Sequence, residues 1–283
     1  MTHKHKKTLD RTIRHILLIT GLSVVVIPMV YMVVSSLKEN SRTFTYPPVL
    51  FPEAGTLTFE NYLHIIKETP IATYMANTMF VSVMTVLISG VVASLLAYAF
   101  ARLPIPMKKV FYAMIISVML IPGLAMIVPQ FELAVRFSLI NSLWGVILFY
   151  AAWVIPFSTF MIRGYIEDNI PFELDESIMI DGGSVFTVYR HVILPMASPA
   201  IAAVSILNFL FPFEELGWSQ AILKKDALRT VPVAVTMFFQ AHNRTDWGYV
   251  FAMTTLAMVP VVIFYLALQR HFVSGLSAGA IKG

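Results

Sequence analysis

Residues 69–101 read TPIATYMANTMFVSVMTVLISGVVASLLAYAFA, a run that contains no Asp, Glu, Lys, Arg or His. A hydrocarbon core of about 30 Å, crossed at about 1.5 Å per residue, needs about 20 residues, so this run is long enough to span a membrane. Five further uncharged runs are also long enough: residues 16–37, 110–131, 137–162, 192–213 and 247–269. The sequence therefore predicts an all-α, polytopic membrane protein with six transmembrane helices.

The composition agrees with a membrane protein. Charged residues make up 13% of the 283 residues, against roughly 25% in soluble domains, and the mean hydropathy is +0.76. The chain has no cysteine, which excludes disulfides, thiol nucleophiles and thiolate metal sites. The net charge is +4, but basic residues cluster before the first span rather than in a soluble domain, so no nucleic-acid partner is expected.

The basic residues also predict the orientation. The apolar region of a signal peptide has about 7 to 15 residues. The first uncharged run, residues 16–37, is longer, so we expect it to be a retained span. With the N-terminus inside, 12 of the 20 Lys and Arg residues fall in cytoplasmic segments. Both termini are therefore predicted to be cytoplasmic, with residues 1–15 as N-terminal segment, 16–270 as membrane domain, a cytoplasmic loop at 163–195, and 271–283 as C-terminal tail.

The start of the second helix and the role of the prolines in the third run need closer inspection. Run 69–101 is longer than a span requires, so we expect the helix to cover about Asn77–Ala101, with Thr69–Ala76 as an approach at the outer interface. Pro122-Gly123 and Pro129 either produce ordinary packing kinks or mark a bent helix that lines a pathway.

The residues missing from the spans limit the mechanism. No Asp, Glu, Lys, Arg or His lies inside the six runs, which disfavours an ion-coupled secondary transporter, a channel or a membrane enzyme. The chain also lacks the phosphate-binding pattern G-x-x-x-x-G-K-[ST]. If the chain drives transport, the energy must come from a partner.

The cytoplasmic loop carries the clearest local signals. Pro171 suits a first helical turn, and Glu173, Asp175 and Glu176 favour the N-terminal end of a helix dipole. Gly182 is suited to end that helix in a left-handed conformation, and Ser184 to cap a second short helix that ends before Pro195. We therefore expect two short helices set at an angle, although an interfacial loop without a partner is the simpler alternative.

This loop resembles the signature of bacterial binding-protein-dependent ABC importer permeases: E-A-A, three residues, G, nine residues, I-x-L-P. Glu176, Gly182, Leu194 and Pro195 match with the spacing intact, whereas Ser177 and Ile178 replace the alanines. Further segments are similar to the carbohydrate-importer branch typified by the maltose permease G subunit: Asn77-Thr78, residues 97–102, residues 246–248 and residues 269–283.

The resemblance implies partners and site residues. In that family the angled helices dock into a groove of a cytoplasmic ATPase, so Glu173, Glu176, Asp181, Gly182, Leu194 and Pro195 are expected to form the coupling loop. The C-terminal tail, through Gly275, Gly279 and Lys282, is expected to reach the ATPase interface. The implied assembly has a second homologous permease, two ATPase subunits, an extracytoplasmic binding protein and membrane lipid around it.

The expected function is that of a non-enzymatic permease subunit for a sugar or sugar-like solute in the bacterial inner membrane. No cofactor or metal is expected in this chain, because ATP and Mg belong to the partner ATPase. A permease of the same superfamily for an amino acid or polyamine is the nearest alternative. Glu214 and Glu215 are candidates for solute or binding-protein contact, with solvated interfacial charges as the alternative.

The orientation can be tested by labelling, because the chain has no native thiol. Cysteines at Gly55 and Lys225 should react with an impermeant maleimide in intact cells. Cysteines at Lys109 and Ser184 should react only after the membrane is opened. Labelling of Ser184→Cys from outside would contradict the orientation.

Overall fold

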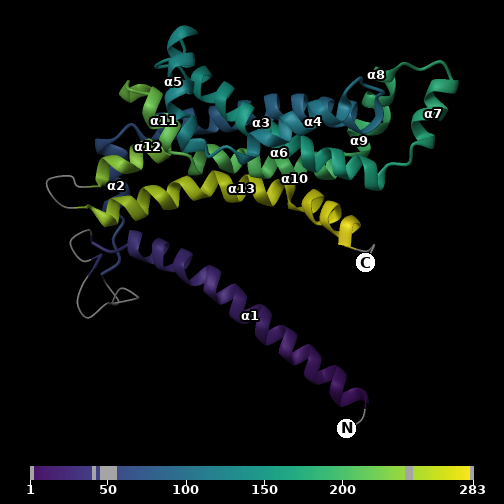
Figure 1. Cartoon of the computed structure of the whole chain (residues 1–283). Helices are drawn as coiled ribbons and strands as arrows, with labels where there is room; N and C mark the ends of the chain where they lie inside the picture. The colour runs from purple at the N-terminus through teal and green to yellow at the C-terminus, as the bar shows by residue number, and fades with distance from the viewer. Residues whose placement is uncertain (1–2, 40–42, 45–55, 240–244, 281–283) are drawn as a thin grey trace. The chain divides into compact units, whose positions relative to one another are not determined.

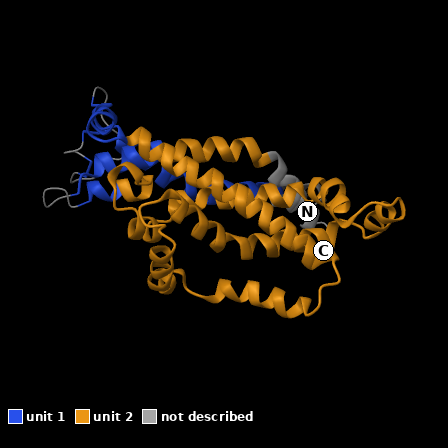
Figure 2. Cartoon of the chain, turned by 90° about the horizontal axis from the view of Figure 1, so that it is seen from above, with its two compact units in different colours: residues 1–70, 235–256 blue, residues 71–234, 257–283 orange. Residues whose placement is uncertain are grey.

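The computed structural model describes residues 3–39, 43–44, 56–239 and 245–280, and every regular element in these ranges is a helix. The all-α fold class is therefore confirmed. Figure 1 shows the long helices and the short ones that connect them. The chain divides into two compact units, residues 1–70 with 235–256 and residues 71–234 with 257–283 (Figure 2).

Four of the described helices are long and apolar enough to cross a membrane. They lie within α1 (His3–Ser36), α3 (Ile71–Arg102), α6 (Leu143–Asn169) and α13 (Trp247–Ala280). Two bent helix pairs pass the same test, Lys108–Leu120 with Gly123–Arg136 and Val185–Met196 with Ser198–Glu214. The described chain thus has up to six spans if each bent pair counts as one, whereas the orientation of the termini stays a prediction.

In the first unit, polar contacts connect the end of α1 to α2 (Glu60–Glu68). The amide of Asn61 donates hydrogen bonds to the carbonyl oxygens of Ser36 and Lys38, at 2.8 and 2.6 Å. The hydroxyl groups of Ser36 and Tyr62 lie 2.6 Å apart. The apolar side chains of α1 from Ile13 to Val30 are exposed, as expected of a helix surrounded by lipid or by a partner.

The second unit is built on α3, α6 and α10 (Ser198–Glu214). The buried amide of Asn208 on α10 donates to the hydroxyl groups of Ser89 on α3 and Ser158 on α6, at 2.9 and 3.0 Å. Small side chains such as Ala93 and Ala97 are fully buried in the same core. Small residues and hydrogen bonds between helices hold membrane bundles together, because lipid offers no hydrophobic driving force for association.

The expected start of the second long helix was wrong. α3 begins at Ile71, not Asn77, and continues without a break to Arg102. Its first turns have polar partners, since the hydroxyl of Tyr74 donates to both carboxylate oxygens of Asp226 at 3.0 Å. The hydroxyl of Thr78 accepts a hydrogen bond from the amide of Val231 at 2.8 Å. These contacts stabilise the first turns of the helix, where an approach to the span was predicted.

The third uncharged run does not form one straight helix. Its two halves are bent by 100°, and the break falls at Pro122. Pro122 has no N–H to donate, and Ile121 before it is extended, as residues that precede proline usually are. The bend predicted at Pro122-Gly123 is confirmed, whereas Pro129 lies within the first turn of α5 (Ile127–Arg136) and interrupts nothing. Whether this segment lines a pathway stays a prediction.

The fifth run is also bent, by 71° between Val185–Met196 and Ser198–Glu214. Residues 192–196 therefore belong to the preceding helical segment and not to α10, and the bend falls at Ala197. The remaining helices are short: α4 (Lys108–Ser117), η2 (Val118–Leu120), η3 (Gly123–Met126), α7 (Glu173–Ile180), α8 (Val185–Val188), η4 (Tyr189–Ile193), α9 (Leu194–Met196), α11 (Gly217–Ile222), η5 (Asp226–Leu228), α12 (Val231–Val235) and η6 (Thr236–Phe238).

Candidate functional site

The loop after α6 folds into two short helices joined by a glycine turn. α7 begins two residues after Pro171, with three acidic residues in its first turn. Gly182 has a φ of +82°, the left-handed conformation that was predicted for it. Its amide donates to the carbonyl of Met179 at 3.1 Å, and the amide of Gly183 donates to Ile178 at 2.8 Å. The turn therefore satisfies the last carbonyl groups of α7.

The second glycine of the turn is needed for a different reason. A Cβ atom at Gly183 would lie 2.4 Å from Cγ2 of Ile178 and 2.8 Å from its carbonyl oxygen. At Gly182 the space is open, and only the backbone conformation favours glycine. Sequence reasoning identified Gly182 but missed Gly183, because close packing against Ile178 leaves no local signal.

The second helix begins as predicted but does not end as predicted. The hydroxyl of Ser184 accepts from the amide of Thr187 at 3.2 Å, and Thr187 accepts from the amide of Ser184 at 3.1 Å, which forms a capping box. The helix was expected to stop before Pro195, but α8, η4 and α9 run together through Pro195 to Met196. η4 is a π-helical turn, and its wider spacing accommodates a proline that lacks an N–H and would crowd the carbonyl of an α-helix.

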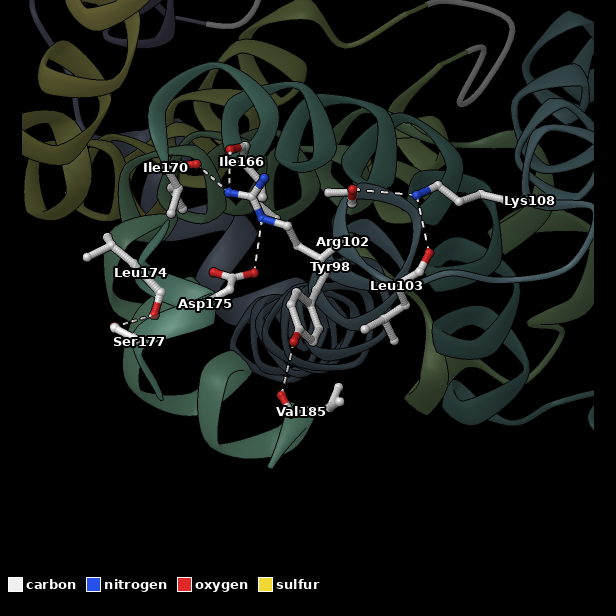
Figure 3. A network of polar contacts seen from close by, with 11 residues as sticks. Tyr98, Arg102, Leu103, Lys108, Ile166, Ile170, Leu174, Asp175, Ser177 and Val185 are labelled. Carbon is white, nitrogen blue, oxygen red and sulfur yellow. Dashed lines mark hydrogen bonds and ion pairs between the residues drawn. The ribbon is translucent and has the colours of Figure 1, made fainter. Parts of the chain in front are cut away.

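The inner face of this segment is anchored in the bundle. Val188 and Ile193 are buried in a core with Ala93 and Ala97 of α3. The hydroxyl groups of Tyr189 and Ser94 lie 2.8 Å apart. The hydroxyl of Tyr98 donates to the carbonyl of Val185 at 3.1 Å (Figure 3). Apolar packing and two tyrosine contacts thus attach α8 and η4 to α3.

α7 is attached by an ion pair. Nε of Arg102, at the end of α3, lies 3.2 Å from Oδ2 of Asp175, and the two side chains are only 9% and 8% exposed. The Arg102 guanidinium also donates to the carbonyl oxygens of Ile166 and Ile170 at the end of α6. Figure 3 shows Arg102 between these carbonyl groups and Asp175. Burial raises the pKa of Asp175 above its ordinary value, and the positive charge of Arg102 opposes that shift.

The outer face of the loop combines acidic and apolar side chains. Glu173, Glu176 and Asp181 are exposed on α7 and its C-terminal turn. Ile180, at the tip of the loop, is 85% exposed, and Phe186 on α8 is also exposed. Such a surface fits a partner that offers both basic groups and an apolar depression.

The predicted coupling residues are not gathered at one point. Glu173, Glu176, Asp181 and Gly182 belong to α7 and its turn, whereas Leu194 and Pro195 belong to α9, where both are exposed. In the C-terminal segment, the backbone of α13 continues through Gly275 and Gly279 to Ala280. Lys282 lies outside the described residues.

The acidic pair at the end of α10, Glu214 and Glu215, separates into two environments. The carboxylate of Glu215 accepts from the amides of Trp218 and Ser219, at 2.8 and 3.3 Å, and from the hydroxyl of Tyr150. Glu215 therefore caps α11 and fixes it to α6. Glu214 is exposed. Of the pair, Glu214 is therefore the residue with an accessible side chain.

The segment after α11 is fixed to the end of the bundle opposite α7 and α8 (Figure 1). The side-chain oxygen of Asn141 accepts from the backbone amides of Lys224 and Lys225, at 2.7 and 3.1 Å. The side-chain amide of Asn77 donates to the carbonyl oxygens of Ala227 and Arg229. The basic residues of this segment are therefore presented by an ordered backbone.

Arg102 and Asp175 were missed as a pair by sequence reasoning. Arg102 was used for orientation and as the last residue of the similar segment 97–102, and Asp175 as one of three acids near a helix start. A usable signal was present, because Arg102 directly follows the longest uncharged run. A charge at a helix end next to a compact loop has to find a partner if the loop folds back over it.

Comparison with known proteins identifies the family. Residues 90–278 match the family described as "Binding-protein-dependent transport system inner membrane component". The chain belongs to this family. It is accordingly a multi-pass inner-membrane permease subunit, and its relatives are permease subunits rather than enzymes.

Individual relatives cover almost the whole permease. The trehalose/maltose transport system permease protein of Thermococcus litoralis is 28% identical over 97% of this chain and 99% of its own length. The diacetylchitobiose uptake system permease protein of Streptomyces coelicolor is 31% identical over 91% of this chain and 92% of its own. A crystal structure of a bacterial ABC transporter involved in the import of the acidic polysaccharide alginate contains a similar fold, with a TM-score of 0.77, 20% identity and coverage of 96% and 99%.

The two glycines of the turn give a local test. Gly182→Val should strain the left-handed position by about 1 to 3 kcal/mol, and Gly183→Ala should push against Ile178. Both should raise the rate of tryptic cleavage after Arg190 by about fivefold or more in detergent-solubilised permease. Gly164→Ala, at a helical position with open space, is the control and should leave the rate unchanged. Cleavage of the Gly182 and Gly183 variants at the control rate would show that the turn does not hold the loop.

Proposed function

We propose that this chain is the membrane permease subunit of an ATP-driven importer that moves a sugar or sugar-like solute by alternating access. An extracytoplasmic binding protein delivers the solute. The observation that carries the proposal is the angled pair formed by α7 and the α8–α9 segment, which has an exposed acidic and apolar face and a buried face anchored to α3 and α6. Such an element suits the transfer of motion from a partner to the spans.

The sugar class is supported by the relatives. Their names specify trehalose, maltose and diacetylchitobiose, and the structural neighbour takes part in the import of a polysaccharide. The alternative solutes, an amino acid or a polyamine, have no comparable support among these proteins. The particular sugar is set largely by the binding protein in this proposal.

The proposed assembly contains a second homologous permease and two cytoplasmic ATPase subunits, which hold ATP and Mg. Glu173, Glu176, Asp181 and Gly182 would meet a groove of the ATPase, with Leu194 and Pro195 at the base of the loop. Exposed Ile180 supplies an apolar contact beside these acids. Gly275, Gly279 and Lys282 would extend toward the interface of the two ATPase subunits.

At the other end of the permease, Glu214 is the candidate for contact with solute or with the binding protein, because Glu215 is occupied by Tyr150 and by the amides of α11. The basic segment after α11, with Lys224 and Lys225, would face the binding protein. Charge complementarity at such a surface increases the rate of encounter more than the final affinity.

Reconstitution tests the proposed function. The permease alone in liposomes should neither hydrolyse ATP nor accumulate solute. With the second permease and the ATPase, hydrolysis should appear, and binding protein loaded with maltose, trehalose or a chitobiose derivative should increase it. As the comparison, an amino-acid mixture or spermidine is added in place of the sugar, and neither should increase ATP hydrolysis. Accumulation of solute by the permease alone under a proton or sodium gradient would contradict the proposal, and stimulation by spermidine or amino acids alone would replace the sugar with the alternative.

A further inference from the structure

α7 has little apolar attachment to the rest of the permease. Asp175 is the buried residue of this helix, and Ile178 is the partly buried residue that packs against the core shared with α3 and α6. The other side chains of α7 are exposed. The direction of α7 therefore depends strongly on what holds Asp175.

Arg102 holds Asp175 and the end of α6 at the same time. Its Nε lies 3.2 Å from Oδ2 of Asp175 in an ion pair, without the alignment of a hydrogen bond, while Nη2 donates to the carbonyl oxygens of Ile166 and Ile170. The guanidinium carbon lies 5.5 Å from the centre of the Phe172 ring, just before α7. A planar guanidinium that donates to two carbonyl oxygens while its charge faces a carboxylate joins three helix ends in a way that a lysine amine does not reproduce.

This ion pair does not serve mainly to increase stability. Both side chains are buried, and neither Oδ1 of Asp175 nor Nε of Arg102 has a hydrogen-bond partner among the described residues. Buried ion pairs recover their desolvation cost only when the remaining polar atoms are satisfied. The raised pKa of Asp175 agrees with this incomplete compensation. Because the desolvation of this ion pair is not fully compensated, the direction that the pair imposes on α7 explains its presence better than a gain in stability does.

We propose that Arg102 is a positioning residue that fixes the direction of α7 relative to α3 and α6, so that displacement of α7 by the ATPase moves both spans together. The inference rests on the proposed function, because it assigns a role within ATP-driven transport. Arg102 and Asp175 do not contact the solute or the ATPase in this account. They connect the exposed face of the loop with the spans.

Arg163 provides a matched control at the same end of α6. It also forms an ion pair, with Glu167 at 2.8 Å, and its guanidinium carbon lies 4.1 Å from the centre of the Tyr112 ring. These partners belong to α6 and α4, not to α7. Arg163→Gln thus removes a charged and stacked arginine without touching the proposed connection.

The first measurement follows the position of α7. Spin labels at Met179 on α7 and Phe160 on α6, both exposed, give a distance distribution by pulsed electron paramagnetic resonance in the assembled transporter. The distribution should be narrow in the native sequence and in Arg163→Gln. It should broaden in Arg102→Gln and, to a smaller extent, in Arg102→Lys, which keeps the charge but not the planar fork.

The second measurement tests whether motion that starts at the ATPase reaches the opposite end of the permease. The labelling rate of Glu214→Cys by an impermeant maleimide is compared between nucleotide-free transporter and transporter trapped with Mg-ATP and orthovanadate. The ATP-dependent change should fall by about 2- to 30-fold in Arg102→Gln, the range expected when a connection between two sites is removed. Vanadate trapping itself and the yield of assembled complex should stay normal, which a general folding defect would not allow.

Each outcome decides the inference. An unchanged distance distribution together with a full ATP-dependent change in Arg102→Gln would overturn it. If Arg102→Gln does not assemble, Asp175→Asn, which keeps the shape and removes the charge, decides by the same two readouts. If the labelling rate of Glu214→Cys does not change with ATP in a permease that keeps Arg102, the proposed function itself is contradicted, and the inference with it.

Discussion

Helices in a bilayer cannot be held together by the hydrophobic effect, because the lipid around them is as apolar as they are. The described structure meets this constraint with small buried residues and with polar contacts between helices. Asn208 joins α10 to α3 and α6, and the hydroxyl groups of Ser94 and Tyr189 join α3 to η4. The Arg102–Asp175 pair extends the same solution to the cytoplasmic loop expected from the sequence. The position of that loop is therefore a consequence of how the bundle itself is assembled.

The loop divides into two faces with different chemistry. Val188 and Ile193 are buried against α3, whereas Ile180 and Phe186 are exposed beside acidic residues. Burial of Ile180 and Phe186 would lower the free energy of folding. Their exposure therefore indicates that a partner covers this face of the loop. The family identifies the chain as a permease of binding-protein-dependent transport systems, and the proposed partner for this face is the ATPase.

Much of the fold could be predicted from the sequence because lipid imposes a simple rule on length and polarity. The uncharged runs located the long helices, and Gly182 and Ser184 located the turn between the two short helices. The start of α3 and the course of the chain through Pro195 could not be predicted, because they depend on Tyr74 meeting Asp226 and on a π-helical turn. The Arg102–Asp175 pair joins residues far apart in the sequence, and a single chain does not reveal such contacts.

Cross-linking tests the central claim, that the exposed face of this loop receives the ATPase. A benzophenone maleimide attached to Ile180→Cys, at the exposed tip of the loop, should cross-link to the ATPase subunit in the assembled transporter after irradiation. The same reagent at Lys225→Cys, in the segment that follows α11, should give no ATPase product, because α11 and α7 lie at opposite ends of the second unit (Figure 1). Absence of an ATPase product from Ile180→Cys in a complex that hydrolyses ATP, or an equal product from Lys225→Cys, would contradict the account.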